Sequence, residues 1–408
     1  MTPPVLLDMT RAVGRRWNGA TPSGIDRVCD AYARHFGGEA LAVVQLRGHA
    51  RVLSPSASRS LFAALDLPTG QFRRKLAALL LRRASSQNLS GAAYLNVGHS
   101  DFDLPAHASW LRKSDVRPVY LLHDLIPITH PQLTTPHKTR RHRGRVEHAL
   151  RQAAGIIVNS QATADELMAF ADGMPFPPRL VAPLGSAAMP VPLRPASSAT
   201  PYFVSVGTIE TRKNHMLLLR AWSNLVEILG AAAPRLVLAG NMGLGGKAVR
   251  DALASDPQLG SHVEIRSGLD DAQIAQLVAA SRAMLLPTLA EGYGLPLVEA
   301  LQMRVPVIAS DLPSLREIGQ GIPTFLDPQD DAAWAATIAD FCADGAEHRR
   351  QLGKVGLFQP PGWEQHFAAC EDWLAQLPRT VNNPCMDSDN RIYRPATQPH
   401  EQGQTAQC

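Results

Sequence analysis

Residues 287–301 read PTLAEGYGLPLVEAL and place two carboxylates, Glu291 and Glu299, eight positions apart around a Gly-Tyr-Gly turn and Pro296. The glycines and the proline argue against one continuous helix through both glutamates. A loop that runs directly into a helix fits better, because proline is tolerated at the first helical position and LVEAL continues as good helix formers. Glu291 is then a loop residue, and Glu299 lies in or just past the first turn, beside N–H groups that suit an anion. Ordinary turn chemistry and helix-dipole complementation would explain the same stretch, so its context decides.

Short apolar runs alternate with amphipathic segments on both sides of this stretch, which is typical of parallel sheets covered by helices. In the second half the runs are 202–208, 235–240, 263–268, 283–288, 305–310 and 323–327. In the first half they are 4–8, 40–46, 92–98, 117–124 and 155–160. The sequence therefore predicts an α/β protein with two doubly wound, Rossmann-like domains.

Domain boundaries follow from breaks in this pattern. A chain of 408 residues is longer than most chains that fold around one hydrophobic core, which favours two domains. We predict a first domain over 1–184, a proline- and serine-rich linker over 185–201 and a second domain over 202–360. Residues 361–378 are predicted as a helix that packs back on the first domain, and the polar residues 379–408 as a disordered tail.

Composition bounds the class of protein. Hydrophobic residues make up 45% and charged residues 19% of the chain, as in ordinary soluble proteins. No apolar run is long enough to span a membrane, and the N-terminus does not resemble a secretion signal. Five cysteines are scattered without C-x-x-C spacing, which favours a reduced, cytoplasmic protein without a zinc site.

The net charge of +4 is unevenly distributed. Residues 71–84 (QFRRKLAALLLRRA) surround an apolar centre with basic residues, and 137–151 form a second basic segment. Two interpretations stay open for them: solvated helix faces, or surfaces that lie on anionic lipid. Nucleic acid is not an expected partner, because aromatic residues are only 6% and none interleave with these clusters.

Two rival kinds of site are disfavoured. The dinucleotide fingerprint G-x-G-x-x-G is absent from both halves, and the glycine-rich residues 239–249 do not fit it, so we interpret them as a flexible crossover. A Walker A loop is also absent. The sequence DFD at 101–103 is a D-x-D match, but it lies in the wrong half for a donor metal. We therefore expect no metal.

Four segments, taken in order, carry a family resemblance. They are VYLLHDLIP (119–127), GIIVNSQATADEL (155–167), VSVGTIETRKNHMLLLRAW (204–222) and the region 269–318 that contains both glutamates. Together they resemble the retaining glycosyltransferases of the large bacterial family 4, of the glycosyl transferases group 1 type. The resemblance covers roughly residues 90–375. It implies the GT-B fold, in which two Rossmann-like domains face each other across a cleft, the first binding acceptor and the second a nucleotide sugar.

The resemblance assigns different roles to the two glutamates. It implies that Glu299 hydrogen-bonds the ribose hydroxyls of a nucleotide, while Glu291 holds the donor sugar. The residue chemistry agrees, since a carboxylate chelates a vicinal diol and a helix N-terminus suits a diphosphate. Backbone N–H groups expected to assist Glu291 belong to Gly292, Tyr293, Gly294 and Leu295.

Basic residues are expected at the departing diphosphate, where negative charge grows as the sugar leaves. Lys213 is the first candidate and Arg212 the second, because consecutive side chains rarely point the same way. Many family members have arginine where this chain has Thr208, so that contact is either missing or supplied by Arg212. The backbone of Gly268 and Leu269 is the expected contact with the base.

Three further positions complete the predicted site. His123 follows a buried strand at the edge where ligands bind, and the resemblance implies that it approaches the donor sugar. Asp124 either orients His123 or caps the next segment. Gly24 resembles the glycine of the family's N-terminal loop near the diphosphate. Asp26 and Arg27 are candidate acceptor contacts, or alternatively a pair at a helix start.

These observations predict a cytoplasmic retaining glycosyltransferase, peripheral at the inner face of the membrane, with His123, Lys213 and Glu291 as catalytic residues. It would transfer a hexose to a lipid-linked saccharide in bacterial surface or exopolysaccharide synthesis. GDP-mannose is the first candidate donor, and a dTDP- or UDP-sugar is nearly as good. A glycan- or nucleotide-binding regulator on the same scaffold is the alternative. A retaining hydrolase is disfavoured, because it needs both carboxylates at the scissile bond.

Overall fold

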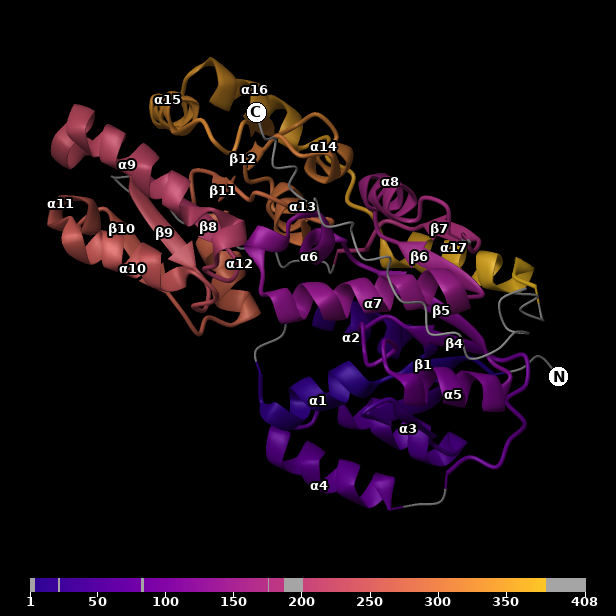
Figure 1. The fold of residues 1–408 in the computed structure, drawn as a ribbon. Helices are drawn as coiled ribbons and strands as arrows, with labels where there is room; N and C mark the ends of the chain where they lie inside the picture. Colours follow the sequence, from indigo (N-terminus) through magenta and orange to yellow (C-terminus); the bar gives the residue numbers. More distant parts are fainter. Residues whose placement is uncertain (1–3, 21–22, 82–83, 175, 187–200, 379–408) are drawn as a thin grey trace, which may run out of the picture.

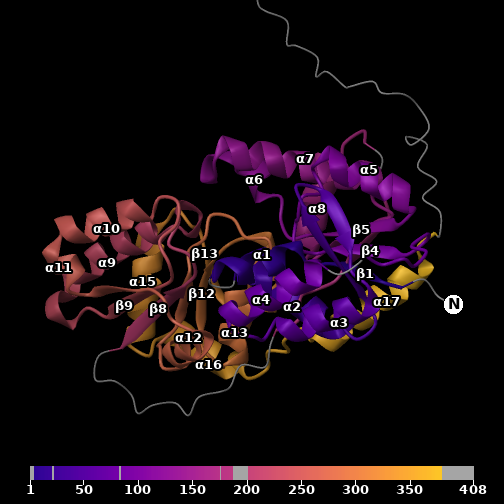
Figure 2. The ribbon, with the colours of Figure 1, turned by 90° about the horizontal axis from the view of Figure 1, so that it is seen from below.

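The computed structural model describes residues 4–20, 23–81, 84–174, 176–186 and 201–378. Over these ranges the chain forms two lobes that lie side by side, each built on one sheet (Figures 1 and 2). The predicted tail, and all of the predicted linker except its ends, lie outside the described residues. None of the described helices combines the length and the apolar character that crossing a membrane requires.

The first lobe is built on a seven-stranded sheet of order β3-β2-β1-β4-β5-β6-β7. Its strands are β1 (Leu6–Asp8), β2 (Leu41–Leu46), β3 (His49–Val52), β4 (Ala93–Asn96), β5 (Arg117–Leu122), β6 (Gly155–Val158) and β7 (Arg179–Val181). The neighbours are parallel except β2 and β3, which pair antiparallel. The sequence predicted neither β3 nor β7, because both are short and largely outside the core, so they lack an apolar run. Arg47 and Gly48, both at positive φ, form the tight turn that makes β3 antiparallel.

The second lobe is built on a six-stranded parallel sheet of order β10-β9-β8-β11-β12-β13. Its strands are β8 (Tyr202–Val206), β9 (Arg235–Ala239), β10 (Val263–Arg266), β11 (Met284–Leu286), β12 (Val307–Ser310) and β13 (Thr324–Leu326). Every apolar run predicted as a strand in either half forms one. The α/β fold with two Rossmann-like sheets is therefore confirmed.

Helices cover both sheets. Those of the first half are α1 (Thr10–Asn18), α2 (Gly24–Phe36), α3 (Pro55–Ala64), α4 (Thr69–Leu80), α5 (Pro105–Ser114), α6 (Ile126–Thr129), η1 (Pro131–Leu133), α7 (Pro136–Gln152) and α8 (Gln161–Phe170). Those of the second half are η2 (Thr211–Lys213), α9 (His215–Leu229), η3 (Gly230–Ala232), α10 (Gly246–Ser255), α11 (Pro257–Gly260), α12 (Asp271–Ala279), α13 (Leu295–Gln302), α14 (Pro313–Gly319), α15 (Asp331–Cys342), α16 (Ala346–Val355) and α17 (Trp363–Gln376).

Strand order fixes where a ligand can bind. Each sheet starts in its middle, runs to one edge and then resumes on the other side, so the order reverses between β1 and β4 and between β8 and β11. At such a switch point the loops that leave neighbouring strands diverge and open a crevice at the carboxyl ends. In the second lobe these loops are 207–210, after β8, and 287–294, after β11.

The glycine-rich residues 239–249 pack tightly against the loop after β8. Backbone hydrogen bonds join Ile209 N to Asn241 O (2.9 Å) and Gly243 N to Ile209 O (2.9 Å). A Cβ on Gly240 would lie 1.9 Å from the Gly207 carbonyl oxygen. The glycines therefore permit close approach of two loops, and the prediction of a flexible crossover here was wrong.

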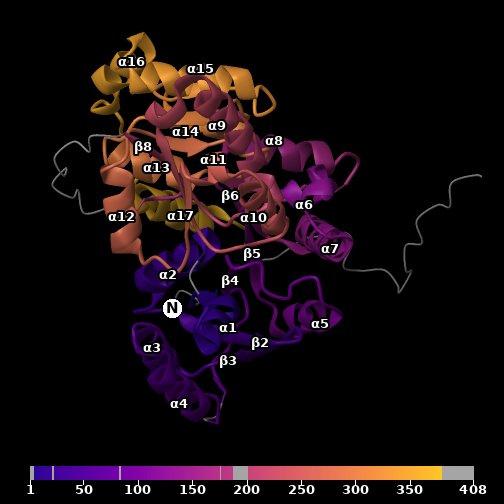
Figure 3. The same cartoon turned by 90° about the vertical axis from the view of Figure 1, so that its left-hand side faces the viewer.

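Helix α17 leaves the second lobe and lies against the first (Figures 1 and 3). Tyr32 Oη and His366 Nε2 are 2.8 Å apart. Arg117 Nη1 donates to the Leu377 carbonyl at 2.9 Å. The last described helix is thus part of the packing of the first lobe.

Candidate functional site

A cavity of about 560 Å³ lies between the carboxyl ends of the two sheets. Its walls come from α2 and the loops after β5 and β6 in the first lobe, and from the loops after β8, β9, β10 and β11 in the second. The residues singled out from the sequence that line it are Gly24, Arg27, His123, Thr208, Arg212, Lys213, Gly268, Leu269, Glu291, Gly292, Tyr293, Gly294, Leu295 and Glu299. Segments far apart in the sequence therefore meet in one space.

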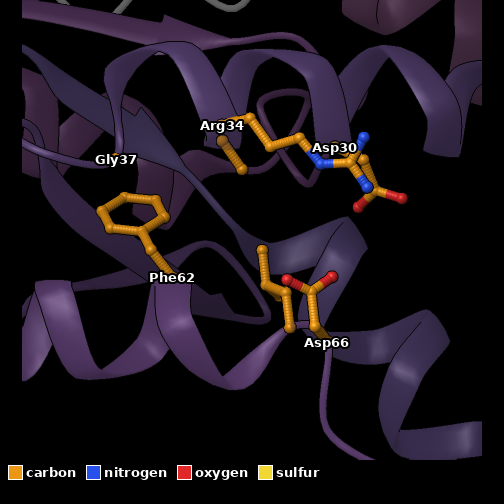
Figure 4. Close-up of a pocket in the computed structure, with 7 residues that line it drawn as sticks. Asp30, Arg34, Gly37, Phe62 and Asp66 are labelled. Carbon is orange, nitrogen blue, oxygen red and sulfur yellow. The ribbon is translucent and has the colours of Figure 1, made fainter. Parts of the chain in front are cut away.

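A smaller cavity of about 190 Å³ lies within the first lobe. Asp30 and Arg34, one turn apart on α2, border it together with Phe62 of α3 and Asp66 (Figure 4). It contains none of the predicted site residues. The larger cavity is therefore the candidate site.

Glu291 is the centre of a charged cluster on the second-lobe wall. Its Oε2 accepts from Lys213 Nζ at 2.6 Å and from Arg212 Nη1 at 3.1 Å. Both cations come from η2, whose tight turn directs two consecutive side chains to one carboxylate. The expectation that these side chains diverge was wrong for this reason.

Burial and charge act in opposite directions in this cluster. Burial alone would raise the pKa of Glu291, but Lys213 and Arg212 outweigh it and lower that pKa to about 2. Burial lowers the pKa of Lys213, and Glu291 offsets this only in part. The cluster therefore holds an ionised carboxylate and two cations in a confined space, and the cations could receive an anion.

Helix α13 begins beside this cluster. Gly294 caps it at φ 100°, and Pro296 occupies the second helical position rather than the predicted first one. A Cβ on Gly292 would lie 2.3 Å from the His123 carbonyl oxygen, so glycine allows the two lobes to touch here. The Tyr293 hydroxyl donates to the Leu184 carbonyl at 2.8 Å.

His123 lies at the end of β5 and is 5% exposed. The Val97 carbonyl is 2.8 Å from Nε2, and because a carbonyl only accepts, Nε2 carries the proton. Burial lowers the pKa of His123 to about 4, against smaller opposing effects of Val97 and Asp124. The ring is thus neutral near pH 7, with Nδ1 as an acceptor. Asp124 accepts from Ile126 N at 3.1 Å and caps the next segment, which was one of its two predicted roles.

Glu299 forms the other charged contact of the cavity. It is 9% exposed and pairs with Arg27 of the first lobe. Arg27 also pairs with Asp271 at 2.6 Å. Burial raises the pKa of Glu299, and Arg27 offsets this only in part. Arg27, predicted as an acceptor contact, therefore lies at the Glu299 end of the cavity.

Asp26 does not line the cavity. It forms a capping box with Ser23 at the start of α2 and pairs with Arg11 at 2.6 Å and Arg15 at 3.1 Å. Of the two roles predicted for Asp26, the structure shows the pair at a helix start, because the carboxylate fixes α2 to α1.

The aspartates of the DFD sequence are paired with arginines. Asp103 accepts from Arg141 at 3.0 Å and from Arg145 at 3.1 Å, and Asp101 pairs with Arg141 at 2.7 Å. Neither aspartate lines the cavity. Part of the basic segment 137–151 is accounted for by these ion pairs.

The predicted site lacked several polar residues of the cavity wall, among them Asn159 and Lys138. Asn159 follows β6, and its Nδ2 donates to the His123 carbonyl at 2.9 Å. The strand-end rule that selected His123 would also have found Asn159. Lys138, near the start of α7, also lines the wall, and the sequence marks it only as part of a basic segment.

Comparison with known proteins addresses the family directly. Residues 194–356, which contain the charged cluster and α13, match the family described as Glycosyl transferases group 1. Over the matched residues, the second lobe is that of a group 1 glycosyltransferase. The chain is similar to the serotype-specific mannosyltransferase WbdA of Escherichia coli, with 36% identity over 125 residues, or 31% of this chain and 15% of WbdA. The match thus spans less than a fifth of that relative.

Other relatives match over different lengths. The O-antigen chain mannosyltransferase B of Escherichia coli is 31% identical over 143 residues, covering 35% of this chain and 37% of that protein. The D-inositol 3-phosphate glycosyltransferase of Xylanimonas cellulosilytica is 25% identical over 400 residues, covering 91% of this chain and 90% of that protein.

Comparison with solved structures shows that the chain has the GT-B fold. HepE of Anabaena, solved with UDP, has a TM-score of 0.62 at 16% identity, covering 92% of this chain and 100% of HepE. Sucrose-phosphate synthase of Thermosynechococcus elongatus has a TM-score of 0.61 at 16% identity, covering 92% of this chain and 99% of that one. At such identity the likeness concerns the fold alone.

Proposed function

We propose that this protein transfers a hexose from a nucleotide sugar to a lipid-linked saccharide, with retention of anomeric configuration, in the synthesis of a bacterial surface polysaccharide. The observation that carries the proposal is the convergence of Lys213 and Arg212 on Glu291, beside the start of α13, at the switch point of the second sheet. Cations at that place match the diphosphate of a nucleotide sugar.

Lys213 and Arg212 would stabilise the departing diphosphate. Their side chains are largely buried, and in such surroundings a fixed cation stabilises developing negative charge far more than it does in water. Glu291 holds both cations in place before a donor arrives. A bound diphosphate would share them with Glu291, whose carboxylate can then accept from sugar hydroxyls.

The first lobe would contribute to the sugar site through His123. With Nε2 committed to the Val97 carbonyl, Nδ1 can accept a hydrogen bond from a donor-sugar hydroxyl. Gly292, in contact with the loop that carries His123, keeps the two walls close enough for one hexose to touch both. Closing the lobes in this way also excludes water from the reacting bond.

The donor is the finer part of the proposal. Mannose is the first candidate sugar and GDP the first candidate nucleotide, and the names of relatives such as WbdA support mannose. A UDP-sugar is the main alternative, because HepE of the same fold was solved with UDP and with UDP-glucose.

A screen of nucleotides against the native protein tests the proposal. GDP, UDP, dTDP and ADP are compared by thermal shift, and GDP is expected to raise the melting temperature most, because a ligand that binds only the native state stabilises it. Turnover is then measured with GDP-mannose and a lipid-linked saccharide. No stabilisation by any of the four would contradict a nucleotide-sugar site, whereas binding without turnover on any donor would favour the regulator.

We propose that transfer needs no metal ion, because Lys213, Arg212 and the start of α13 supply the positive charge that a cation would otherwise provide. Activity should therefore persist in EDTA. Loss of turnover in EDTA with recovery in Mn²⁺ would contradict this.

We also propose a cytoplasmic protein that attaches to the inner face of the membrane through α4. Arg73, Arg74 and Lys75 are exposed on that helix, and Leu81 after it is 88% exposed. Figure 3 shows α4 at the end of the first lobe that is farthest from the second. The buried residues Phe72, Leu76 and Leu79 belong to the core, so the exposed face is narrower than the sequence suggested. Arg82 and Arg83 lie outside the described residues.

Sedimentation with liposomes tests this attachment. Reversing the charges of Arg73, Arg74 and Lys75 should release the protein from anionic vesicles, since each basic residue contributes about 1 kcal/mol near such a surface. The matched control reverses Lys247 and Arg250 on α10. Equal sedimentation of the α4 variant and the wild type would leave α4 a solvated face.

A further inference from the structure

Arg27 bridges the two lobes at the cavity. It lies on α2, in the first lobe, and its two terminal nitrogens pair with Glu299 and, at 2.6 Å, with Asp271 of the second lobe. Glu299 is largely buried, whereas the Asp271 side chain is 74% exposed. The contact with Glu299 is therefore the one that water screens least.

The backbone that carries Arg27 is firmly held. The preceding residue, Asp26, closes the capping box of α2 and pairs with Arg11 and Arg15 of α1. Close to the helix start, a Cβ on Gly24 would lie 3.4 Å from Leu295 of the second lobe, which is ordinary packing distance. Arg27 thus reaches across from a fixed base, and the place of its guanidinium depends on how the lobes are arranged.

A buried carboxylate needs a partner to remain ionised. Burial disfavours the charged form of Glu299, and Arg27 is the cation that opposes this effect. A neutral carboxylic acid would be a poorer acceptor for two neighbouring hydroxyl groups than a carboxylate held by an arginine.

We propose that Arg27 is a positioning residue of the nucleotide site, holding the Glu299 carboxylate in place so that the ribose is bound well only when the two lobes are together. This inference rests on the proposed function, in which Glu299 binds the ribose. Arg27 acts through Glu299 and does not itself touch the nucleotide. Nucleotide binding and the closed arrangement of the lobes are thereby coupled through one ion pair.

Calorimetry with GDP, and with UDP as second probe, tests the coupling. Arg27→Ala and Glu299→Ala should each raise Kd about tenfold or more. The double variant should lose no more nucleotide affinity than the single variant that binds less tightly, because the two residues act as a unit. Arg27→Lys should recover part of the affinity, and in Arg27→Ala the loss should fall on the donor KM more than on kcat. Arg220→Ala, at an exposed ion pair with Asp331, is the matched control and should bind like wild type.

Three outcomes would overturn the inference without affecting the proposed function. If Arg27→Ala binds GDP and UDP as tightly as the wild type, the inference is wrong. Additive losses of affinity in the double variant would also contradict it. A lower melting temperature with unchanged Kd would give Arg27 a structural role only. Wild-type protein that binds neither nucleotide would overturn the proposed function, and this inference with it, whereas the first three results leave that function standing.

Discussion

The two sheets share the same reversal of strand order, yet their switch points hold different chemistry. In the first lobe the carboxylate at this place is Asp8, at the end of β1, and in the second it is Glu291, after β11. Asp8 is 2% exposed and accepts from Gln45 (2.7 Å) and from the Tyr94 hydroxyl (2.8 Å). Glu291 is held by two cations.

The partners decide the charge. Burial raises the pKa of Asp8 to about 6, and its neutral hydrogen-bond donors offset this only in part. The two cations lower the pKa of Glu291 to about 2 in spite of burial. The first switch point therefore holds a carboxylate whose charge burial disfavours, while two cations stabilise the charge of the carboxylate at the second. The same topology provides a position for a ligand, and side-chain chemistry decides whether that position is used.

The largest effect is expected from removing the cation at the second switch point. Lys213→Ala should lower kcat about 100-fold or more with a smaller change in nucleotide affinity, because the ammonium acts on charge that grows as the sugar leaves. Glu291→Gln should behave alike, since it releases both cations. Saturated turnover is measured beside calorimetry, with Lys247→Ala on α10 as the exposed control. If Lys213→Ala loses nucleotide affinity and turnover in equal proportion, Lys213 stabilises the bound donor as strongly as it stabilises the transition state.

The next effect concerns stability at the first switch point. Since the pKa of Asp8 is raised from 3.8 to about 6 in the folded protein, the folded state binds the extra proton, and the free energy of unfolding should fall as pH rises from about 4 to 6. The loss is roughly 2 to 3 kcal/mol. Asp8→Asn should abolish that slope in urea titrations, and Asp251→Asn, at an exposed ion pair, should keep it. An unchanged slope in Asp8→Asn would assign the titration to another group.

Glu291 contributes with the opposite sign. Its folded pKa of about 2 lies below the ordinary value of 4.5, so its contribution is complete above about pH 4.5 and is lost on acidification toward pH 2. Between about pH 4.5 and pH 2, the free energy of unfolding should therefore fall less for Glu291→Gln than for the wild type. Asp8 and Glu291 therefore change the free energy of unfolding in different pH ranges, so a pH titration can separate their contributions.

The smallest effect is expected at Glu299, which would bind ribose in both ground and transition states. Glu299→Ala should raise the donor KM about tenfold and change kcat less. Glu264→Ala, at a surface ion pair within β10, is the matched control. Similar kinetics for the Glu291→Gln and Glu299→Ala variants would contradict the separation of roles between the two glutamates.

Sequence patterns predicted the site where it follows from strand ends. The strand runs and the rule that ligands bind at carboxyl edges placed His123 and Glu291 after strands, and the family resemblance implied their roles and that of Lys213; all three line one cavity. The same reasoning would have included Asn159. These predictions depend on backbone topology, which the alternation of apolar runs determines well.

Predictions failed where the contacts of a side chain depend on a neighbouring helix or turn. Asp26 and Arg27 are adjacent on α2 and point about 100° apart, and only the position of α1 shows that Asp26 is used internally while Arg27 faces the second lobe. The convergence of Arg212 and Lys213 depends on a turn of 3₁₀ type that the sequence does not mark.

The return of α17 to the first lobe has a consequence during synthesis. Helices α2 and α17 are separated by more than 300 positions in the chain, yet Tyr32 of α2 contacts His366 of α17. A ribosome delivers α2 first, so the surface around Tyr32 stays exposed until almost all of the second lobe has been translated. A domain formed by one continuous stretch of chain can fold as it leaves the ribosome, so its core surface is not exposed for this time. Here the first lobe can reach its final packing only after the second has been made, which favours chaperone binding to the nascent chain over that interval.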